Sequence, residues 1–180
     1  NRVIQIDRPI PWQHDSAYNS SEIGADKMAE FNKYGTTAFV VIQNNKIRYE
    51  AYWDGGSDTT RSNSFSAAKS IVSLLVGCAL DEGKIKNLDQ PITDYLPEFK
   101  NTNGYKLRIR DLLTMSSGLD WDEGYSSLFS PTTKAYYGSH LDEQMLSLQV
   151  KSEPGKVFNY QSCDTQLLSM ILEKATGKPL

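Results

Sequence analysis

Histidine and cysteine are both scarce in this chain of 180 residues. With only His14 and His140 present, a metal site built from several histidines is excluded, and a Ser-His-Asp triad would depend on one of these two residues. Cys78 and Cys163 are too few for a disulfide framework and lack the paired spacing of a zinc site, so two free, partly buried thiols are expected. We therefore expect no metal and no cofactor.

Long apolar runs and clusters of basic residues are also missing. The longest apolar stretch, residues 71–80, is interrupted by Ser73 and Gly77, whereas a membrane-spanning helix needs about 20 apolar residues. The 19 Lys and Arg residues face 22 Asp and Glu residues, for a net charge of −3, and form no basic block, so nucleic acid is not an expected partner. A Gly-x-Ser-x-Gly elbow and glycine-rich phosphate loops are absent as well. An enzyme of this composition would use Ser, Tyr, Lys or carboxylates.

Hydrophobic periodicity and turn residues predict both helices and strands. Two strands, over residues 37–43 and 46–53, are rich in β-branched and aromatic residues and form a hairpin around Asn44-Asn45, because Asn tolerates positive φ. The helix expected over residues 66–82 has apolar side chains on every side, which is typical of a buried helix. A long aromatic-rich connection is expected over residues 119–140. The other expected helices are those from a Ser20-Ser21 cap to Tyr34, and over residues 89–96, 109–115, 141–150 and 166–175.

Ser66 and Lys69 form a Ser-x-x-Lys pattern at the start of the helix expected over residues 66–82. With 19 Ser and 13 Lys in the chain, about one such pattern arises by chance, so its position matters more than its presence. Residues three apart on a helix share a face, so Lys69 can exchange a proton with the Ser66 hydroxyl, and the first-turn N–H groups can stabilise an oxyanion. The alternative is a capping Ser beside a solvated Lys. However, a capping Ser is usually followed three residues later by Glu or Gln rather than Lys.

A Tyr-x-Ser pattern occurs four times, beginning at Tyr18, Tyr125, Tyr137 and Tyr160. Only the copy that begins at Tyr160 lies between a Pro-Gly turn and an apolar helix. On these residues alone, the simpler alternative is favoured, in which Tyr160 packs in the core and its hydroxyl bonds to the backbone.

Seven blocks follow one another along the chain: FSAAKS at 65–70, GKI at 83–85, LDQP at 88–91, YLPE at 95–98, IRDLLTMSSGL at 109–119, PGKVFNY at 154–160 and LL…ILEKATG at 167–177. Taken together and in this order, they resemble the serine β-lactamase-like superfamily. This group includes class C β-lactamases, penicillin-binding D-alanyl-D-alanine peptidases, esterases and 6-aminohexanoate-oligomer hydrolases. The resemblance covers nearly the whole chain, and the order and spacing of the blocks make it specific.

This resemblance implies an α+β fold of the β-lactamase/transpeptidase type. A helical region would occupy residues 66–180, and an antiparallel sheet would contain the hairpin at about residues 37–53. By the same resemblance Ser66 is the acylated nucleophile, Lys69 its proton partner, and Tyr160 the base that also protonates the leaving group. A tyrosine, with an ordinary pKa of about 10, becomes a usable base when an adjacent cation favours its phenolate.

The resemblance also suggests a small-molecule ester, amide or peptide-like substrate. Ser162 stands where the β-lactamases of this group carry Asn. At this position the chain is more similar to the aminohexanoate-hydrolase-like members, and this similarity favours an ester or amide substrate. Trp121, Tyr125, Tyr136 and Tyr137 are a candidate substrate-binding wall, with core packing the equal alternative for each. The alternative functions are a β-lactamase or D-Ala-D-Ala carboxypeptidase, and a non-catalytic binding or regulatory relative.

The same resemblance implies elements that would follow residue 180. A third active-site element, a Lys/His-Thr/Ser-Gly strand, comes after the Tyr-bearing segment in this superfamily, followed by further strands and a closing helix. The chain is therefore expected to be the N-terminal part of one such domain, inactive alone, and completed by the rest of a longer chain or by another chain. Because residue 1 is Asn and members are often exported, a periplasmic or extracellular location is favoured, with a cytoplasmic one as the alternative.

Overall fold

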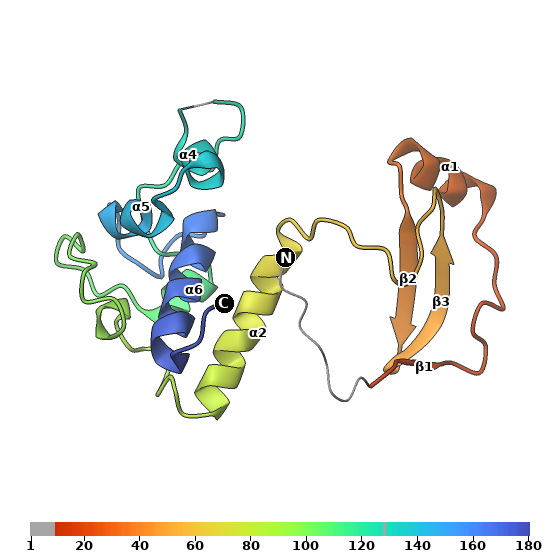
Figure 1. Ribbon diagram of the computed structural model, residues 1–180, viewed down its shortest axis with the longest axis horizontal. Helices are drawn as coiled ribbons and strands as arrows, with labels where there is room; N and C mark the ends of the chain where they lie inside the picture. Colours follow the sequence, from red (N-terminus) through yellow and green to blue (C-terminus); the bar gives the residue numbers. More distant parts are fainter. Residues whose placement is uncertain (1–9, 128) are drawn as a thin grey trace. The chain divides into compact units, whose positions relative to one another are not determined.

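The computed structural model describes residues 10–127 and 129–180 (Figure 1). The chain divides into two compact units, residues 1–63 and residues 64–180, and each is described by itself. Within the described residues, no helix combines the length and the apolar character needed to cross a membrane. The same residues bring together no group of three or more His, Cys, Asp or Glu side chains that could hold a metal ion.

The first unit contains a three-stranded sheet in the order β1-β3-β2. Strands β2 (Ala38–Gln43) and β3 (Lys46–Tyr52) form the predicted antiparallel hairpin, and Asn44 and Asn45 turn the chain with φ values of 52° and 58°. The sequence did not predict β1 (Gln13–His14), which pairs in parallel with β3 and makes the sheet mixed rather than antiparallel. Two residues are too short a run to show an alternating pattern.

Helix α1 (Ala25–Lys33) belongs to the same unit. It begins after Gly24 rather than at the predicted Ser20-Ser21 cap, because the Ser20 hydroxyl donates to the Ala17 carbonyl and so closes a turn before the helix. Phe31 packs against the hairpin through ring contacts with Phe39 and Trp53, whose centroids lie 4.9 and 5.6 Å away. These three rings join the helix to the sheet.

The second unit is helical and is built around α6 (Ser162–Thr176). Helix α2 (Ala67–Asp81) runs beside α6, and α3 (Ile109–Leu113) and α5 (Leu141–Ser147) also pack against it (Figure 1). Because α6 has neighbours on several sides, seven of its residues are buried. A short 3₁₀ helix, η1 (Ile92–Asp94), stands where a longer helix was expected over residues 89–96.

Helix α2 differs from its prediction in burial. Its start and end agree with the sequence, but only Val72, Val76 and Ala79 are buried, on the side that faces α6. Ile71 and Leu74 are 56% and 65% exposed. The expectation of burial on every side was therefore wrong for the described residues, because their packing covers one face of the helix.

The connection over residues 119–140 is more ordered than predicted. It contains α4 (Pro131–Tyr137), where the Ser130 hydroxyl caps the Thr133 N–H group and Pro131 occupies the first turn. The start of the connection is held by an isolated bridge between Leu119 and Val150. Several candidate site residues thus lie on a segment that is bridged at its start and contains a capped helix.

Candidate active site

Ser66 stands at the first turn of α2, where its side chain faces Lys69 rather than the helix backbone. The Lys69 Nζ atom donates a hydrogen bond to Ser66 Oγ at 3.2 Å. Ser66 has helical backbone angles of −70° and −8°, and its hydroxyl makes no capping bond to the described backbone. The alternative of a capping Ser beside a solvated Lys is therefore wrong, and the Ser-x-x-Lys spacing places the two groups in contact.

The N–H groups that follow Ser66 are not available to an oxyanion in this conformation. Those of Ala67, Ala68 and Lys69 donate to the carbonyls of residues 64, 65 and 66 at 3.0–3.2 Å. The expectation that these groups would stabilise an oxyanion was wrong, because a tight first turn satisfies them internally. An oxyanion at Ser66 would need other donors.

The residue before Ser66 has an unusual backbone conformation. Phe65 has a φ of 42°, a left-handed value that is uncommon for a bulky residue and costs about 1–3 kcal/mol. Strain of this kind persists only where the surrounding structure enforces it. The chain therefore enters α2 at a sharp, strained turn that presents the Ser66 side chain at its start.

Tyr160 lies against the Ser66–Lys69 pair. Lys69 Nζ is 5.2 Å from the centroid of the Tyr160 ring, and Tyr160 is 39% exposed, so the core-packing alternative is wrong. The Ser66 hydroxyl is the largest influence on the Tyr160 pKa and lowers it, burial opposes this, and hydrogen bonding and charge from Lys69 lower it further. The net result is a pKa below the ordinary value of 10.0. The structure thus brings together the three residues that the resemblance assigned to catalysis.

The backbone around Tyr160 is fixed from both sides. The Asn159 N–H group donates to the Met115 carbonyl at 2.8 Å. The buried Gln161 amide donates to the carbonyls of Leu119 and Trp121 at 3.1 and 3.2 Å. These bonds tie the Tyr160 segment to residues 40 or more positions away in sequence, and they set the position of the Tyr160 side chain.

Ser162 is the first residue of α6, which begins four residues earlier than predicted. Its N–H group and hydroxyl both donate to the Glu123 carboxylate, at 2.7 and 2.5 Å. Burial raises the pKa of Glu123, but hydrogen bonds from Ser162, Tyr125 and Trp121 outweigh burial and bring it below its ordinary value. Sequence reasoning missed Glu123, because no pattern in its own segment marks it as a partner of Ser162, a residue 39 positions away.

The four aromatic residues predicted to line the site divide into two groups. Trp121 is only 7% exposed and belongs to the hydrophobic core, yet its ring also borders a cavity beside Lys69. Tyr125, Tyr136 and Tyr137 are 65%, 67% and 86% exposed and border a second cavity, so packing in the core does not explain them.

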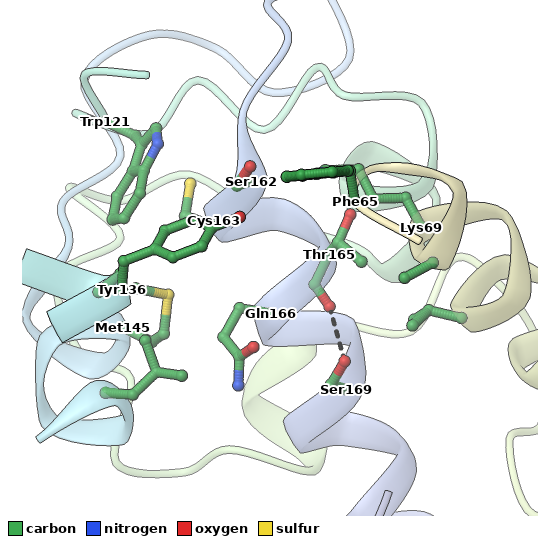
Figure 2. Close-up of a pocket in the computed structure, with 14 residues that line it drawn as sticks. Phe65, Lys69, Trp121, Tyr136, Met145, Ser162, Cys163, Thr165, Gln166 and Ser169 are labelled. Atoms are coloured by element: carbon green, nitrogen blue, oxygen red, sulfur yellow. Dashed lines mark hydrogen bonds between the residues drawn. The ribbon is translucent and has the colours of Figure 1, made fainter. Parts of the chain in front are cut away.

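The cavity beside Lys69 has a volume of about 410 Å³ and runs between α2, α6 and α5. Figure 2 shows the Gln166 side chain projecting into it, with Met145 and Tyr136 along one side and Lys69 across from them. The described lining contains no carboxylate, and Lys69 is its charged group. The second cavity, of about 470 Å³, includes Ser66 and is polar and aromatic in character.

A buried polar network lies behind Ser162. Asp164 is fully buried, and its Oδ1 atom accepts a hydrogen bond from the Ser117 hydroxyl at 2.6 Å. Its Oδ2 atom has no hydrogen-bond partner among the described residues. Burial raises the pKa of Asp164 to about 7. The neighbouring Cys163 thiol is also buried, which raises its pKa, whereas Cys78 is exposed, and both are free.

The fold and this arrangement of Ser, Lys and Tyr define a member of the serine β-lactamase-like group. The family model described as Beta-lactamase matches residues 25–180, so the chain belongs to this family. Family membership confirms the resemblance stated from the sequence blocks, and the α+β fold class with it.

Individual relatives agree with this assignment. The 6-aminohexanoate-dimer hydrolase of Paenarthrobacter ureafaciens is 28% identical over 153 residues, which cover 79% of this chain and 38% of that protein. A Bacillus anthracis structure provisionally assigned as a 6-aminohexanoate-dimer hydrolase has a TM-score of 0.71 at 24% identity, over 88% of this chain and 44% of that one. A class C β-lactamase has a TM-score of 0.59 at 18% identity, over 84% of this chain and 42% of its own. The chain thus spans less than half the length of each of these three relatives.

Proposed function

We propose that this chain carries the nucleophile and base of a serine hydrolase that cleaves an ester or amide bond through an acyl-enzyme on Ser66. The observation that carries the proposal is the contact of three groups, in which Lys69 Nζ lies 3.2 Å from Ser66 Oγ and 5.2 Å from the Tyr160 ring centroid. A nucleophile within hydrogen-bond reach of a proton partner, with a third group beside both, is the arrangement that activates a serine.

The proposed reaction has two steps. Ser66 Oγ attacks the substrate carbonyl carbon while the Tyr160 phenolate takes the hydroxyl proton, and the tetrahedral intermediate collapses when Tyr160 returns this proton to the leaving oxygen or nitrogen. Water then attacks the acyl carbon and gives a proton to Tyr160. The bond from the acyl carbon to Ser66 Oγ breaks as Tyr160 passes this proton to Oγ, which releases the acid and restores the Ser66 hydroxyl and the Tyr160 phenolate. Lys69 supports both steps by favouring the phenolate, in accord with the lowered pKa of Tyr160.

The cavity beside Lys69 and the residue at position 162 support the proposed substrate class. Ser162 takes the place of the Asn that the β-lactamases carry, and the cavity beside Lys69 is apolar along Met145 with the neutral amide of Gln166 projecting into it. A neutral or weakly polar acyl chain suits such a lining, because a cationic chain would lose hydration and meet no carboxylate there. The relative named as a 6-aminohexanoate-dimer hydrolase supports an amide with a linear chain.

The decisive experiment is labelling of the full-length protein with a fluorophosphonate probe, followed by peptide mass spectrometry. We expect one adduct, on Ser66, and its loss in Ser66→Ala. Ser73→Ala is the matched control, because Ser73 lies two turns further along α2 and is exposed. Adduct formation that persists in Ser66→Ala would refute the assignment.

Substrate comparison separates the remaining alternatives. The full-length protein would be assayed with a p-nitrophenyl ester, a linear aliphatic amide, nitrocefin and a D-Ala-D-Ala peptide. The proposal predicts a higher kcat/KM for the ester or the amide than for the other two. Nitrocefin as the best substrate would support a β-lactamase, and absence of both turnover and adduct would support a non-catalytic relative.

A further inference from the structure

Glu123 joins the aromatic segment over residues 121–125 to the first turn of α6. Each of its carboxylate oxygens accepts two hydrogen bonds. Oε2 accepts from the Ser162 N–H group and from Trp121 Nε1, both at 2.7 Å. Oε1 accepts from the Ser162 hydroxyl at 2.5 Å and from the Tyr125 hydroxyl. Hydrogen bonds to an ionised acceptor are stronger than those between neutral groups, so four of them make a firm junction.

The segment that carries Glu123 is itself held in place. The Asp122 side chain accepts from the Gly124 N–H group at 2.9 Å and so closes a turn around Glu123. The Asp122 carbonyl accepts from the Thr132 hydroxyl at 2.9 Å, which connects this turn to α4. The backbone at Glu123 is therefore held in place by hydrogen bonds, and this restricts where its carboxylate can lie beside Ser162.

We propose that Glu123 is a positioning residue of the active site, which holds residues 160–162 in register so that the Tyr160 hydroxyl meets Ser66 and Lys69. The inference rests on the proposed function, in which Tyr160 is the base. Ser162 lies two residues after Tyr160, and Gln161 between them is bonded to the carbonyls of Leu119 and Trp121. Without the bonds of Glu123 to Ser162, the C-terminal side of Tyr160 would keep the Gln161 contacts and the Ser117–Asp164 bond, but would lose the two bonds that fix the first residue of α6.

Glu123 also acts on Tyr160 through its charge. The charged and titratable groups that act on Tyr160 are Lys69, which favours the phenolate, and Glu123, which opposes it. The groups that interact with Glu123 in turn are Tyr125, Tyr160, Cys163 and Asp164. Removing the negative charge at position 123 therefore lowers the pKa of Tyr160, because an opposing charge is lost.

Two variants separate the charge from the hydrogen bonds. In Glu123→Gln the amide oxygen can face the two N–H donors, and the amide nitrogen can face the hydroxyls of Ser162 and Tyr125, which can rotate to accept. This variant keeps the junction and loses the charge. Glu123→Ala loses both.

The experiment measures pH profiles of kcat and KM on an ester substrate, with folding monitored by near-ultraviolet circular dichroism. For Glu123→Ala we expect kcat to fall about 10²-fold with KM within about twofold, since misplaced catalytic groups lower the rate more than binding. For Glu123→Gln we expect a smaller loss and an acidic limb of kcat/KM shifted to lower pH. Glu143→Gln, at an exposed carboxylate on α5, is the control and should change neither.

A second readout does not depend on turnover. Ultraviolet difference titration, with Tyr160→Phe as the subtracted reference, reports the ionisation of Tyr160 directly and should show a lower pKa in Glu123→Gln.

If Ser66→Ala abolishes activity while both Glu123 variants match the wild type in kcat, pH profile and titration, the role of Glu123 is refuted and the proposed function stands. If Ser66→Ala stays active but the titration shift appears, the proposed function fails and the effect of Glu123 on Tyr160 stands. Should Glu123→Ala not fold, the profile and titration of Glu123→Gln decide the question.

Discussion

The Ser117 hydroxyl and the Asp164 carboxyl form a buried hydrogen bond of 2.6 Å across 47 residues of sequence. It connects the turn after α3 to the first turn of α6, directly behind Ser162. Ser117 is also within 3.2 Å of Gln161 Oε1, so the same hydroxyl reaches the residue that follows Tyr160. The conformation of the candidate base therefore depends on a buried carboxyl that makes no contact with the nucleophile in the described structure.

Asp164 predicts a pH dependence of stability. Its pKa rises from 3.8 to about 7 on folding, because burial disfavours the charged form. The folded state then binds more protons than the unfolded state between these values, so the contribution of Asp164 is favourable at low pH and is lost as pH rises from about 4 to 7. The loss is at most on the order of 4 kcal/mol. Urea unfolding of Asp164→Asn should show a flatter pH profile over this range, and an unchanged slope would contradict the prediction.

Tyr160→Phe should lower kcat by about 10²- to 10⁴-fold, the usual contribution of a general acid–base group. Stability should change little, because Tyr160 is partly exposed. Tyr105→Phe is a matched control, since Tyr105 is also 39% exposed and lies away from both cavities. The measurement is kcat/KM on an ester alongside thermal unfolding. Equal activity in the two variants would remove Tyr160 from the mechanism.

Gly118→Ala should destabilise the protein by roughly 2–4 kcal/mol, because strain and overlap add. Gly118 has a φ of 70°, and a Cβ atom there would lie 2.3 Å from the Ser152 carbonyl oxygen. Gly77→Ala offers the opposite case, since a Cβ atom on this α2 residue meets nothing within 4 Å. It should stabilise by about 0.5–1 kcal/mol through the lower entropy of the unfolded chain. Urea midpoints of the two variants should move in opposite directions.

Asn45 allows a test of the hairpin. With its φ of 58°, Asn45→Gly should preserve or slightly raise the midpoint of thermal unfolding, and Asn45→Val should lower stability by about 1–2 kcal/mol. The difference between the two variants is the measured quantity. A tolerated valine would mean that the turn is not required to hold β2 against β3.

The parts of the fold that follow from neighbouring residues could be predicted. Asn44-Asn45 marked the hairpin because the preference for positive φ is local. The limits of α2 were predicted because an apolar run begins just after Ser66 and stops before Gly83. The start of α6 was predicted four residues late, since its first turn is held by Glu123, a residue 39 positions away. Local patterns contain no signal for such a contact.

The candidate site also contains residues that local sequence predicts and residues that depend on distant contacts. Ser66 and Lys69 are three residues apart, so helix geometry alone brings them together, whereas the resemblance was needed to add Tyr160 to them. Glu123 could not be predicted because it lies in a segment without helical or alternating periodicity. Its importance comes from four hydrogen bonds that exist only after the chain has folded.

The contrast between Cys78 and Cys163 gives the protein a built-in reporter of local opening. A thiol reagent should modify the exposed Cys78 at once, whereas Cys163, 1% exposed and next to Ser162, can react only when the first turn of α6 separates from its surroundings. In a Cys78→Ser background, the slow labelling rate therefore measures how often the Tyr160 segment loses its support. Motion at the candidate active site can be followed in this way without a substrate.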